Sequence, residues 1–261
     1  MGYLSLAAQI FISMVGVPMF DHVLNFLYPP RCAACAERQP PDTIRRLCVR
    51  CLARIERVNE PWCEICGIPL TAATVESSRW CVQCAKSPPH FSTARAIARY
   101  RPNAGEDLQT VPSIIRRHKY GLDQSLARAL AECLGEIVPL AGNDYDVIIP
   151  VPLHRGRLRW RGFNQAALLG TAVARWMRRP MDVSNLVRVR ATAPQTSQDH
   201  HQRRANVRRA FAIKRPRRVA NCRVLLVDDV MTTGATADEC ARTLLEAGAR
   251  RVDVLTLARA V

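Results

Sequence analysis

The sequence predicts an α/β fold with a parallel sheet, preceded by a small cysteine-rich domain that binds metal. Strand-like apolar runs alternate with helical patterns over residues 91–261, and four Cys-x-x-Cys pairs lie within residues 27–90. Alternation of strands and helices is typical of a sheet covered by helices on both faces. We therefore divide the chain into an apolar segment at 1–26, a cysteine-rich domain at 27–90 and an α/β domain at 91–261.

The elements of the α/β domain follow from their apolar patterns. Short continuous apolar runs predict buried parallel strands, and apolar residues at helical spacing predict helices. Strands are expected at residues 94–101, 146–152, 222–227 and 252–257. Helices are expected at residues 108–118, 124–140, 164–177 and 235–247, the last with Gly248 in its C-cap position. The final strand, helix and strand form a βαβ unit.

The chemically most informative segment joins the strand that ends at Val227 to the helix that follows it. Asp228 and Asp229 come directly after the strand, and Thr-Thr-Gly-Ala-Thr at 232–236 opens the helix. Ligands bind at the carboxyl ends of parallel strands, and a helix N-terminus holds phosphate. The two carboxylates suit sugar hydroxyls or a metal–water shell, so the segment predicts a sugar phosphate ligand. A plain strand-to-helix turn with an Asp cap explains one Asp but not two.

Residues 227–236 resemble the 5-phosphoribosyl 1-diphosphate signature of the type I phosphoribosyltransferases, which have a Rossmann-like parallel sheet with flanking helices. The resemblance implies that Asp228 and Asp229 are catalytic and contact the ribose hydroxyls, and that Mg²⁺ is carried on the diphosphate. It also implies a cradle for the 5-phosphate, formed by Thr232, Thr233, Gly234, Ala235 and Thr236.

Two further observations concern the same site. His154 and Arg155 follow the strand at 146–152, so they are expected at the same sheet edge, where they face the diphosphate or are solvated loop charges. Residues 161–165 are expected at the start of the helix, with Asn164 as its cap. Thr232 stands where purine-salvage members carry an acidic residue, so the acceptor substrate and turnover itself stay open.

Five segments narrow the resemblance to the ComF competence family. They are residues 119–121 (Lys-Tyr-Gly), 151–155 (Val-Pro-Leu-His-Arg), 161–165 (Arg-Gly-Phe-Asn-Gln), 195–196 (Gln-Thr) and 203–208 (Arg-Arg-Ala-Asn-Val-Arg). The cysteine-rich domain resembles the zinc ribbon of that family, and the resemblance extends from about Leu27 to Val261. It implies a role in DNA uptake and natural transformation, with proteins of DNA uptake or recombination as partners.

The eight paired cysteines predict two structural zinc sites, because four thiolates complete a tetrahedral zinc shell. Consecutive pairs are the simpler assignment, and a cross-braced arrangement stays open. Disulfides are the alternative, but such pairs beside a nucleotide-type domain suggest a reducing cytoplasm. Cys133, Cys222 and Cys240 are expected as core thiols. The expected ligands are Cys32, Cys35, Cys48, Cys51, Cys63, Cys66, Cys81 and Cys84.

The charge is concentrated in one stretch. The net charge is +16, and residues 150–220 contain sixteen Arg and one Lys against two Asp. Such a field attracts polyanions, although a solubilising surface would give the same count. Trp160 lies among arginines, and an aromatic in this setting stacks an unpaired base, unless it is a packed turn residue. We therefore expect single-stranded DNA to contact Arg157, Arg159, Trp160 and Arg161.

Two functional hypotheses remain from the sequence. One is a Mg²⁺-dependent phosphoribosyltransferase of nucleoside metabolism with an unknown acceptor. The other is a non-catalytic single-stranded DNA-binding protein whose phosphoribosyl site is regulatory or vestigial. The first twenty residues carry no charge. We favour a packed or interface helix for them, with membrane contact as the alternative, since a span needs about 20 apolar residues.

Overall fold

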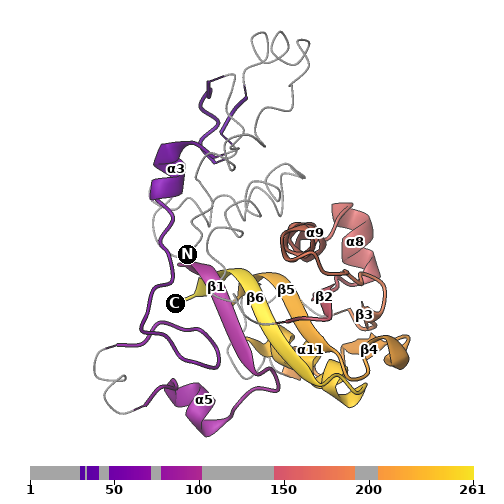
Figure 1. Ribbon diagram of the computed structural model, residues 1–261. Helices are drawn as coiled ribbons and strands as arrows, with labels where there is room; N and C mark the ends of the chain where they lie inside the picture. Colours follow the sequence, from indigo (N-terminus) through magenta and orange to yellow (C-terminus); the bar gives the residue numbers. More distant parts are fainter. Residues whose placement is uncertain (1–29, 33, 41–46, 72–77, 102–143, 192–204) are drawn as a thin grey trace, which may run out of the picture.

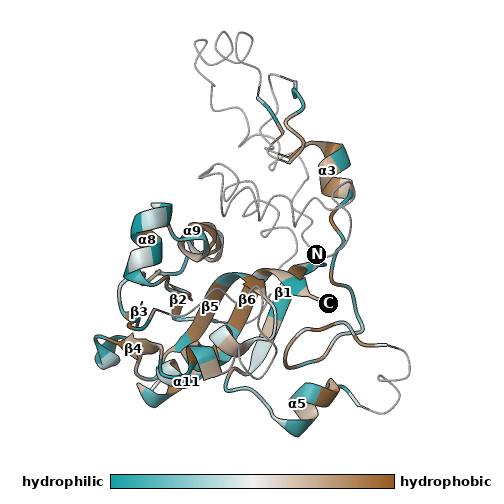
Figure 2. Ribbon diagram, turned by 180° about the vertical axis from the view of Figure 1, so that it is seen from behind, coloured by the Kyte–Doolittle hydropathy of each residue, from teal (hydrophilic) through white to brown (hydrophobic). Residues whose placement is uncertain are grey.

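The computed structural model describes residues 30–32, 34–40, 47–71, 78–101, 144–191 and 205–261. Its central sheet has four parallel strands in the order β1 (Thr93–Tyr100), β6 (Arg251–Ala260), β5 (Arg223–Met231) and β2 (Val147–Pro150) (Figure 1). The apolar runs of β2, β5 and β6 are buried on both faces, as a parallel sheet requires. Figure 2 shows β5 and β6 as mostly hydrophobic strands. The predicted α/β class is confirmed.

Two helices cover opposite faces of this sheet (Figures 1 and 2). Helix α9 (Gln165–Met177) packs on β2 and β5, and helix α11 (Ala235–Glu246) packs on β5 and β6. Leu225 belongs to the core beneath α9, whereas Leu226 belongs to the core beneath α11. Because successive strand residues face opposite sides, the all-apolar run of β5 serves both cores.

Several short elements were not predicted. Helix α8 (Arg155–Arg161) follows β2, and β3 (Leu186–Arg188) pairs antiparallel with β4 (Phe211–Ile213). A 3-10 helix, η4 (Pro216–Arg218), leads into β5. These elements are too short to show a periodicity, and α8 has no buried residue.

The cysteine-rich part consists of two equivalent units. In each, a tight turn follows the first cysteine, with N–H···O bonds of 2.8 Å from Ala36 to Cys32 and 2.9 Å from Gly67 to Cys63. In each, the third cysteine caps a short helix, which is α3 (Val49–Ala53) in the first unit and α5 (Val82–Lys86) in the second. Residues 36 and 67 both have positive φ, 61° and 67°.

The second unit is built into the α/β core. Cys63, Cys66 and Cys84 share a core cluster with residues of β2, β5 and β6. The Ala94 N–H donates to the Ile65 carbonyl at 2.6 Å. A Cβ on Gly67 would lie 2.5 Å from the Ala94 carbonyl oxygen, so the sequence requires glycine here.

Some expectations concern residues outside the described part. These are the segment 1–26, the helices at 108–118 and 124–140, Cys133, and the segments 119–121, 195–196 and 203–204. Among the described residues, no helix has the length and apolar character needed to cross a membrane. Cys240 is fully buried, as expected, but Cys222 is only half-buried, because it lies in the exposed turn before β5.

Candidate functional site

Strand β5 continues four residues beyond Val227, where the sequence predicted its end. Asp228 pairs in register with Thr256 of β6, and the strand ends at Met231. Each Asp accepts the next backbone N–H, from Asp229 at 2.9 Å and from Val230 at 2.7 Å. Acidic residues look like turn residues in sequence, but here they occupy the open carboxyl end of the strand. Both carboxylates are therefore held on a rigid element.

The turn after β5 contains only Thr232, Thr233 and Gly234 before α11 begins. Gly234 has φ of 81° and is the N-cap of α11. The Thr233 hydroxyl accepts from the Ala235 N–H at 3.3 Å, which holds the turn against the first helical residue. Helix N-termini carry a partial positive charge and favour anions. The half-buried hydroxyls of residues 232, 233 and 236 adjoin this helix end.

His154 and Arg155 lie at the same sheet edge as this turn. Pro150 pairs with Val227, and the Val151 N–H donates to the Val227 carbonyl at 2.9 Å. The His154 Nδ1 accepts from the Gly156 N–H at 3.3 Å and so caps α8. Arg155 is exposed in the first turn of α8.

Arg188 is a site residue that the sequence did not reveal. It lies on β3, where its backbone forms an isolated parallel β-bridge with His154. Its guanidinium lies over the Phe211 ring, 5.4 Å from the ring centroid. Burial lowers the pKa of Arg188 and the nearby charge of Arg157 lowers it further, whereas Cys240 and Asp228 act to raise it. Arg188 therefore lies in electrostatic reach of both α8 and the carboxylate end of β5. Its only sequence signal is a short alternating run, Leu-Val-Arg-Val-Arg.

The Arg-Gly-Phe-Asn-Gln segment is a corner between two helices. Arg161 ends α8 instead of opening a helix, because Gly162 takes φ of 78° and breaks the helix there. Asn164 caps α9 as predicted, accepting from Ala166 at 3.1 Å, and its amide also donates to Val151 at 3.0 Å. The corner therefore fixes the direction in which α8 leaves the sheet.

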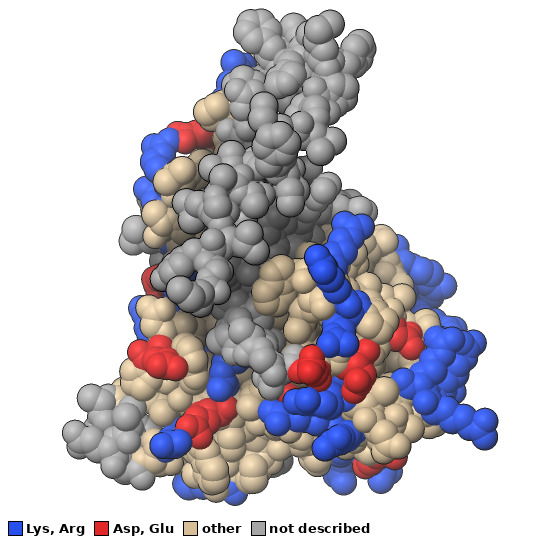
Figure 3. Space-filling view, in the orientation of Figure 1, with Lys and Arg blue, Asp and Glu red and all other residues tan. Residues whose placement is uncertain are grey.

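Helix α8 presents a basic and aromatic surface. Trp160 is 70% exposed, so its interpretation as a packed turn residue is wrong. Arg159 is exposed, and the Arg161 guanidinium lies 6.0 Å from the Trp160 ring. Figure 3 shows Lys and Arg side chains gathered on the side where Figure 1 places α8 and β4.

The eight paired cysteines form two four-sulfur clusters from consecutive pairs. One comprises Cys32, Cys35, Cys48 and Cys51, and the other comprises Cys63, Cys66, Cys81 and Cys84. Within each cluster the ligand atoms lie within 4.8 Å of one another.

The geometry of both clusters fits zinc. The Cys35 and Cys48 sulfurs lie 3.8 Å apart, and those of Cys66 and Cys81 lie 3.6 Å apart. A tetrahedral shell with Zn–S bonds of about 2.3 Å requires an edge of about 3.8 Å, far longer than a disulfide. The side-chain hydrogen bond with Cys66 lowers the pKa of Cys63, against the effect of burial, so a thiolate is favoured at this sulfur. These cysteines would hold two structural zinc ions that cross-link their ribbons.

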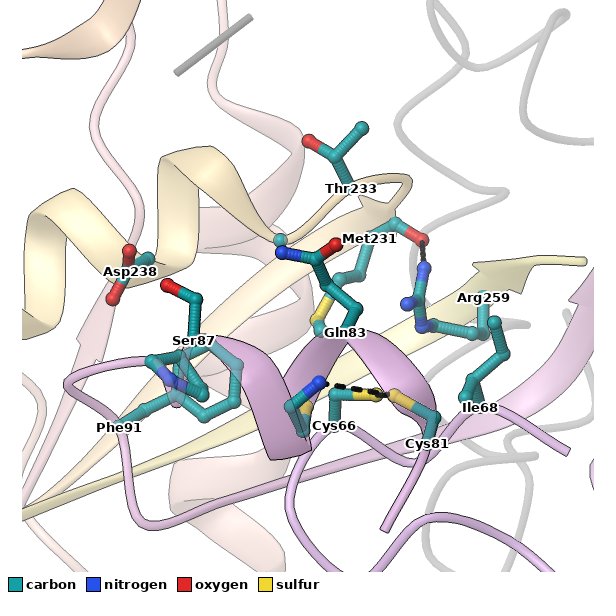
Figure 4. A pocket seen from close by; sticks show the side chains of 13 residues that line it. Cys66, Ile68, Cys81, Gln83, Ser87, Phe91, Met231, Thr233, Asp238 and Arg259 are labelled. Atoms are coloured by element: carbon teal, nitrogen blue, oxygen red, sulfur yellow. Dashed lines mark hydrogen bonds between the residues drawn. The ribbon is translucent and has the colours of Figure 1, made fainter. Parts of the chain in front are cut away.

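The second cluster lies next to the turn after β5. A pocket of about 90 Å³ separates them, lined by Cys66, Cys81 and Cys84 on one side and by Met231, Thr233 and Gly234 on the other (Figure 4). Arg259, also in its wall, donates to the Met231 carbonyl at 3.0 Å. No sequence pattern predicted this contact.

Comparison with known proteins adds three findings. Residues 23–85 match a family model described as a double zinc ribbon domain. The chain is 33% identical to DNA utilization protein YhgH of Escherichia coli O157:H7 over 218 residues, which is 82% of this chain and 90% of that protein. It is 32% identical to Competence protein F of Haemophilus influenzae over 221 residues, again 82% and 90% of the two chains.

Solved structures are also similar in part. The glutamine phosphoribosylpyrophosphate amidotransferase of B. subtilis matches 51% of this chain and 26% of its own, at 22% identity and a TM-score of 0.36. The purine phosphoribosyltransferase of Pyrococcus horikoshii matches 54% of this chain and 75% of its own, at 22% identity and a TM-score of 0.29.

Proposed function

Because this chain belongs to the ComF family of competence and DNA-utilization proteins, we propose that it binds 5-phosphoribosyl 1-diphosphate with Mg²⁺ and acts in DNA uptake. The observation that carries the ligand assignment is the carboxyl end of β5. Two carboxylates, a Thr-Thr-Gly turn and the N-terminus of α11 succeed one another there within nine residues.

Each part of this edge matches one part of the ligand. The 5-phosphate is held by the turn at 232–234 and the first turn of α11, where N–H groups and hydroxyls converge. Asp228 and Asp229 accept hydrogen bonds from the ribose hydroxyls. Mg²⁺, which prefers oxygen ligands and keeps several waters, neutralises the diphosphate and makes it a better leaving group.

The diphosphate then lies toward the cationic side of the site. His154 and Arg155 come shortly after β2 in the chain, and Arg188 pairs with His154 through a β-bridge. A guanidinium stabilises the charge that develops on a departing diphosphate, and positioning supplies most of the remaining catalysis. If the protein is an enzyme, it transfers the pentosyl group to an acceptor, and we assign no acceptor.

A second function, binding of single-stranded DNA, is favoured by the exposed surface of α8. An exposed Trp among arginines offers a stacking face and phosphate contacts in one place. Arg157 also lies in electrostatic reach of Arg188. The DNA surface and the phosphoribosyl site are therefore neighbours without sharing their main contact residues.

The Asp229→Asn substitution tests the ligand assignment. We expect it to weaken binding of 5-phosphoribosyl 1-diphosphate by about 10- to 100-fold, since a charged hydrogen-bond acceptor contributes about 1.5–3 kcal/mol. Affinity for a single-stranded oligonucleotide should stay within about twofold. Asp144→Asn, which changes an exposed carboxylate paired with Arg179, is the matched control and should bind both ligands normally. Loss of DNA binding in a folded Asp229→Asn protein would contradict the proposal that DNA and the phosphoribosyl ligand bind at separate sites.

The DNA surface is tested by the double substitution Arg157→Gln and Arg159→Gln. Loss of two phosphate contacts should flatten the slope of log K against log salt by about 1.4, at the value of about 0.7 per contact for single strands. The control is the double substitution Arg215→Gln and Arg217→Gln, which removes the same charge from exposed residues at η4. Fluorescence anisotropy measures both. Equal loss in the two variants would mean that net charge, not α8, attracts the DNA.

A further inference from the structure

Arg259, near the end of β6, is buried beneath residues 232–234, the proposed phosphate turn. It is 6% exposed, and its Nη1 donates to the carbonyls of Met231 and Thr232. It also contacts its neighbour, the Ala260 carbonyl, at 3.3 Å. Its register partner on β5 is Met231, which explains how the side chain reaches the turn. One guanidinium therefore holds two successive carbonyl groups, that of the last residue of β5 and that of the first residue of the turn.

Holding these carbonyls fixes the direction of the adjacent N–H groups. In a planar trans peptide the C=O and the following N–H point in opposite directions. With the carbonyls of Met231 and Thr232 turned toward Arg259, the N–H groups of Thr232 and Thr233 point away from it. Successive N–H groups presented in this way form a concave anion site. Arg259 thus orients the donors without contacting the anion.

A buried guanidinium needs a negative partner, since an unpaired buried charge is costly. Among the described residues, no carboxylate forms a salt bridge with Arg259, and its buried Nε has no hydrogen-bond partner. Arg259 lines the same pocket as Cys66 and Cys81 of the second cysteine cluster (Figure 4). A zinc ion with four thiolates carries a net charge of 2−.

We infer that Arg259 is a positioning residue for the phosphate turn, and that the second zinc centre is its counter-ion. The zinc centre then has a role beyond stabilising its ribbon, because its charge keeps the guanidinium under the turn. The ligand part of this inference rests on the proposed function. The orientation of the turn by Arg259 does not, and it is measurable in the ligand-free protein.

Arg95 supplies a matched control. It lies beside the same cluster, since its hydrogen-bond partner Glu64 is the residue that follows Cys63. Its guanidinium donates to the carbonyls of Glu64 and Ala94 and lies 5.4 Å from the Trp62 ring. None of these partners belongs to the phosphate turn. Arg95→Met and Arg259→Met therefore remove the same charge from the same zinc centre but differ at the turn.

The first measurement is amide hydrogen exchange over residues 230–237 in the free, zinc-loaded protein. Arg259→Met should raise exchange of this segment at least tenfold, Arg259→Lys should raise it less, and Arg95→Met should leave it within twofold. Both Met variants should retain two zinc ions per chain. Unchanged exchange in Arg259→Met, or an equal rise in Arg95→Met, would overturn the inference whether or not the protein binds a phosphoribosyl ligand.

Titration with ribose 5-phosphate tests the consequence for binding. Arg259→Met should bind at least tenfold more weakly than wild type, and Arg95→Met should bind like wild type. If the wild type itself binds neither this probe nor the diphosphate, the proposed function fails while the exchange result still decides the role of Arg259.

The counter-ion is tested by exchanging one thiolate for a neutral imidazole that retains zinc. Cys81→His halves the net charge of the second centre and should raise exchange of residues 230–237 severalfold. Cys48→His makes the same change at the equivalent helix-capping position of the first centre and should leave that segment unchanged. Identical exchange of residues 230–237 in the two variants would show that the second zinc centre is not the counter-ion of Arg259.

Discussion

Replacing Cys63 with Ser is expected to release one of two zinc ions and to destabilise the α/β domain by more than about 4 kcal/mol, the range reached when a structural metal is lost. The reason is the position of the second cluster. Cys63 is fully buried and shares a core with residues of β2, β5 and β6. Zinc loss therefore opens this core and does not merely loosen a peripheral ribbon.

Urea denaturation and zinc content measure this effect together. Cys222→Ser is the matched control, because its half-buried sulfur lies outside both clusters and donates to the carbonyls of Arg218 and Ala220, as a hydroxyl also can. It should retain two zinc ions and change the free energy of unfolding by less than about 0.5 kcal/mol. A Cys63→Ser protein with two zinc ions and wild-type stability would contradict the assignment of the second centre.

Replacing Asp253 with Ala should cost about 3–5 kcal/mol, as removal of one partner from a buried charge network does. Asp253 is fully buried at the start of β6. It accepts from the Thr93 N–H at 3.0 Å, from the Tyr145 hydroxyl at 3.2 Å and from the Arg251 Nε at 2.8 Å. Burial and the charge of Asp253 both raise the pKa of Tyr145, so its phenol stays neutral and needs this acceptor.

The control for this variant is Asp144→Ala. That carboxylate is 85% exposed and pairs with Arg179, so its loss should cost less than about 1 kcal/mol. Chemical denaturation at neutral pH compares the two. A cost below about 1 kcal/mol for Asp253→Ala would mean that the network around the β1–β6 junction relaxes without it.

The sequence was informative wherever a local pattern carried the structure. The buried strands, helix α9 and the cysteine clusters each leave a short signature, and Asn164 was recognisable as a helix cap. The exact end of β5 was not predictable, because Asp228 and Asp229 have low strand propensity and stay in the strand through pairing with β6.

The residues that sequence reasoning did not find act across long separations. Arg188 reaches the site through the short β3–β4 pair, and Arg259 through its register with Met231. Neither stands in a motif, since an Arg in a strand is ordinary until its neighbours in space are known. The packing of the second ribbon against the α/β core could not be predicted either. Cysteine spacing indicates which residues bind the metal, but not which residues pack around them.

Calorimetric titration of the zinc-loaded wild-type protein with 5-phosphoribosyl 1-diphosphate, with and without Mg²⁺, tests the proposed ligand. We expect saturable binding of one ligand per chain that strengthens with Mg²⁺ and is competed by ribose 5-phosphate. If a folded protein with two zinc ions does not bind the ligand, the proposed phosphoribosyl site is wrong, and the basic surface of α8 becomes the main functional site.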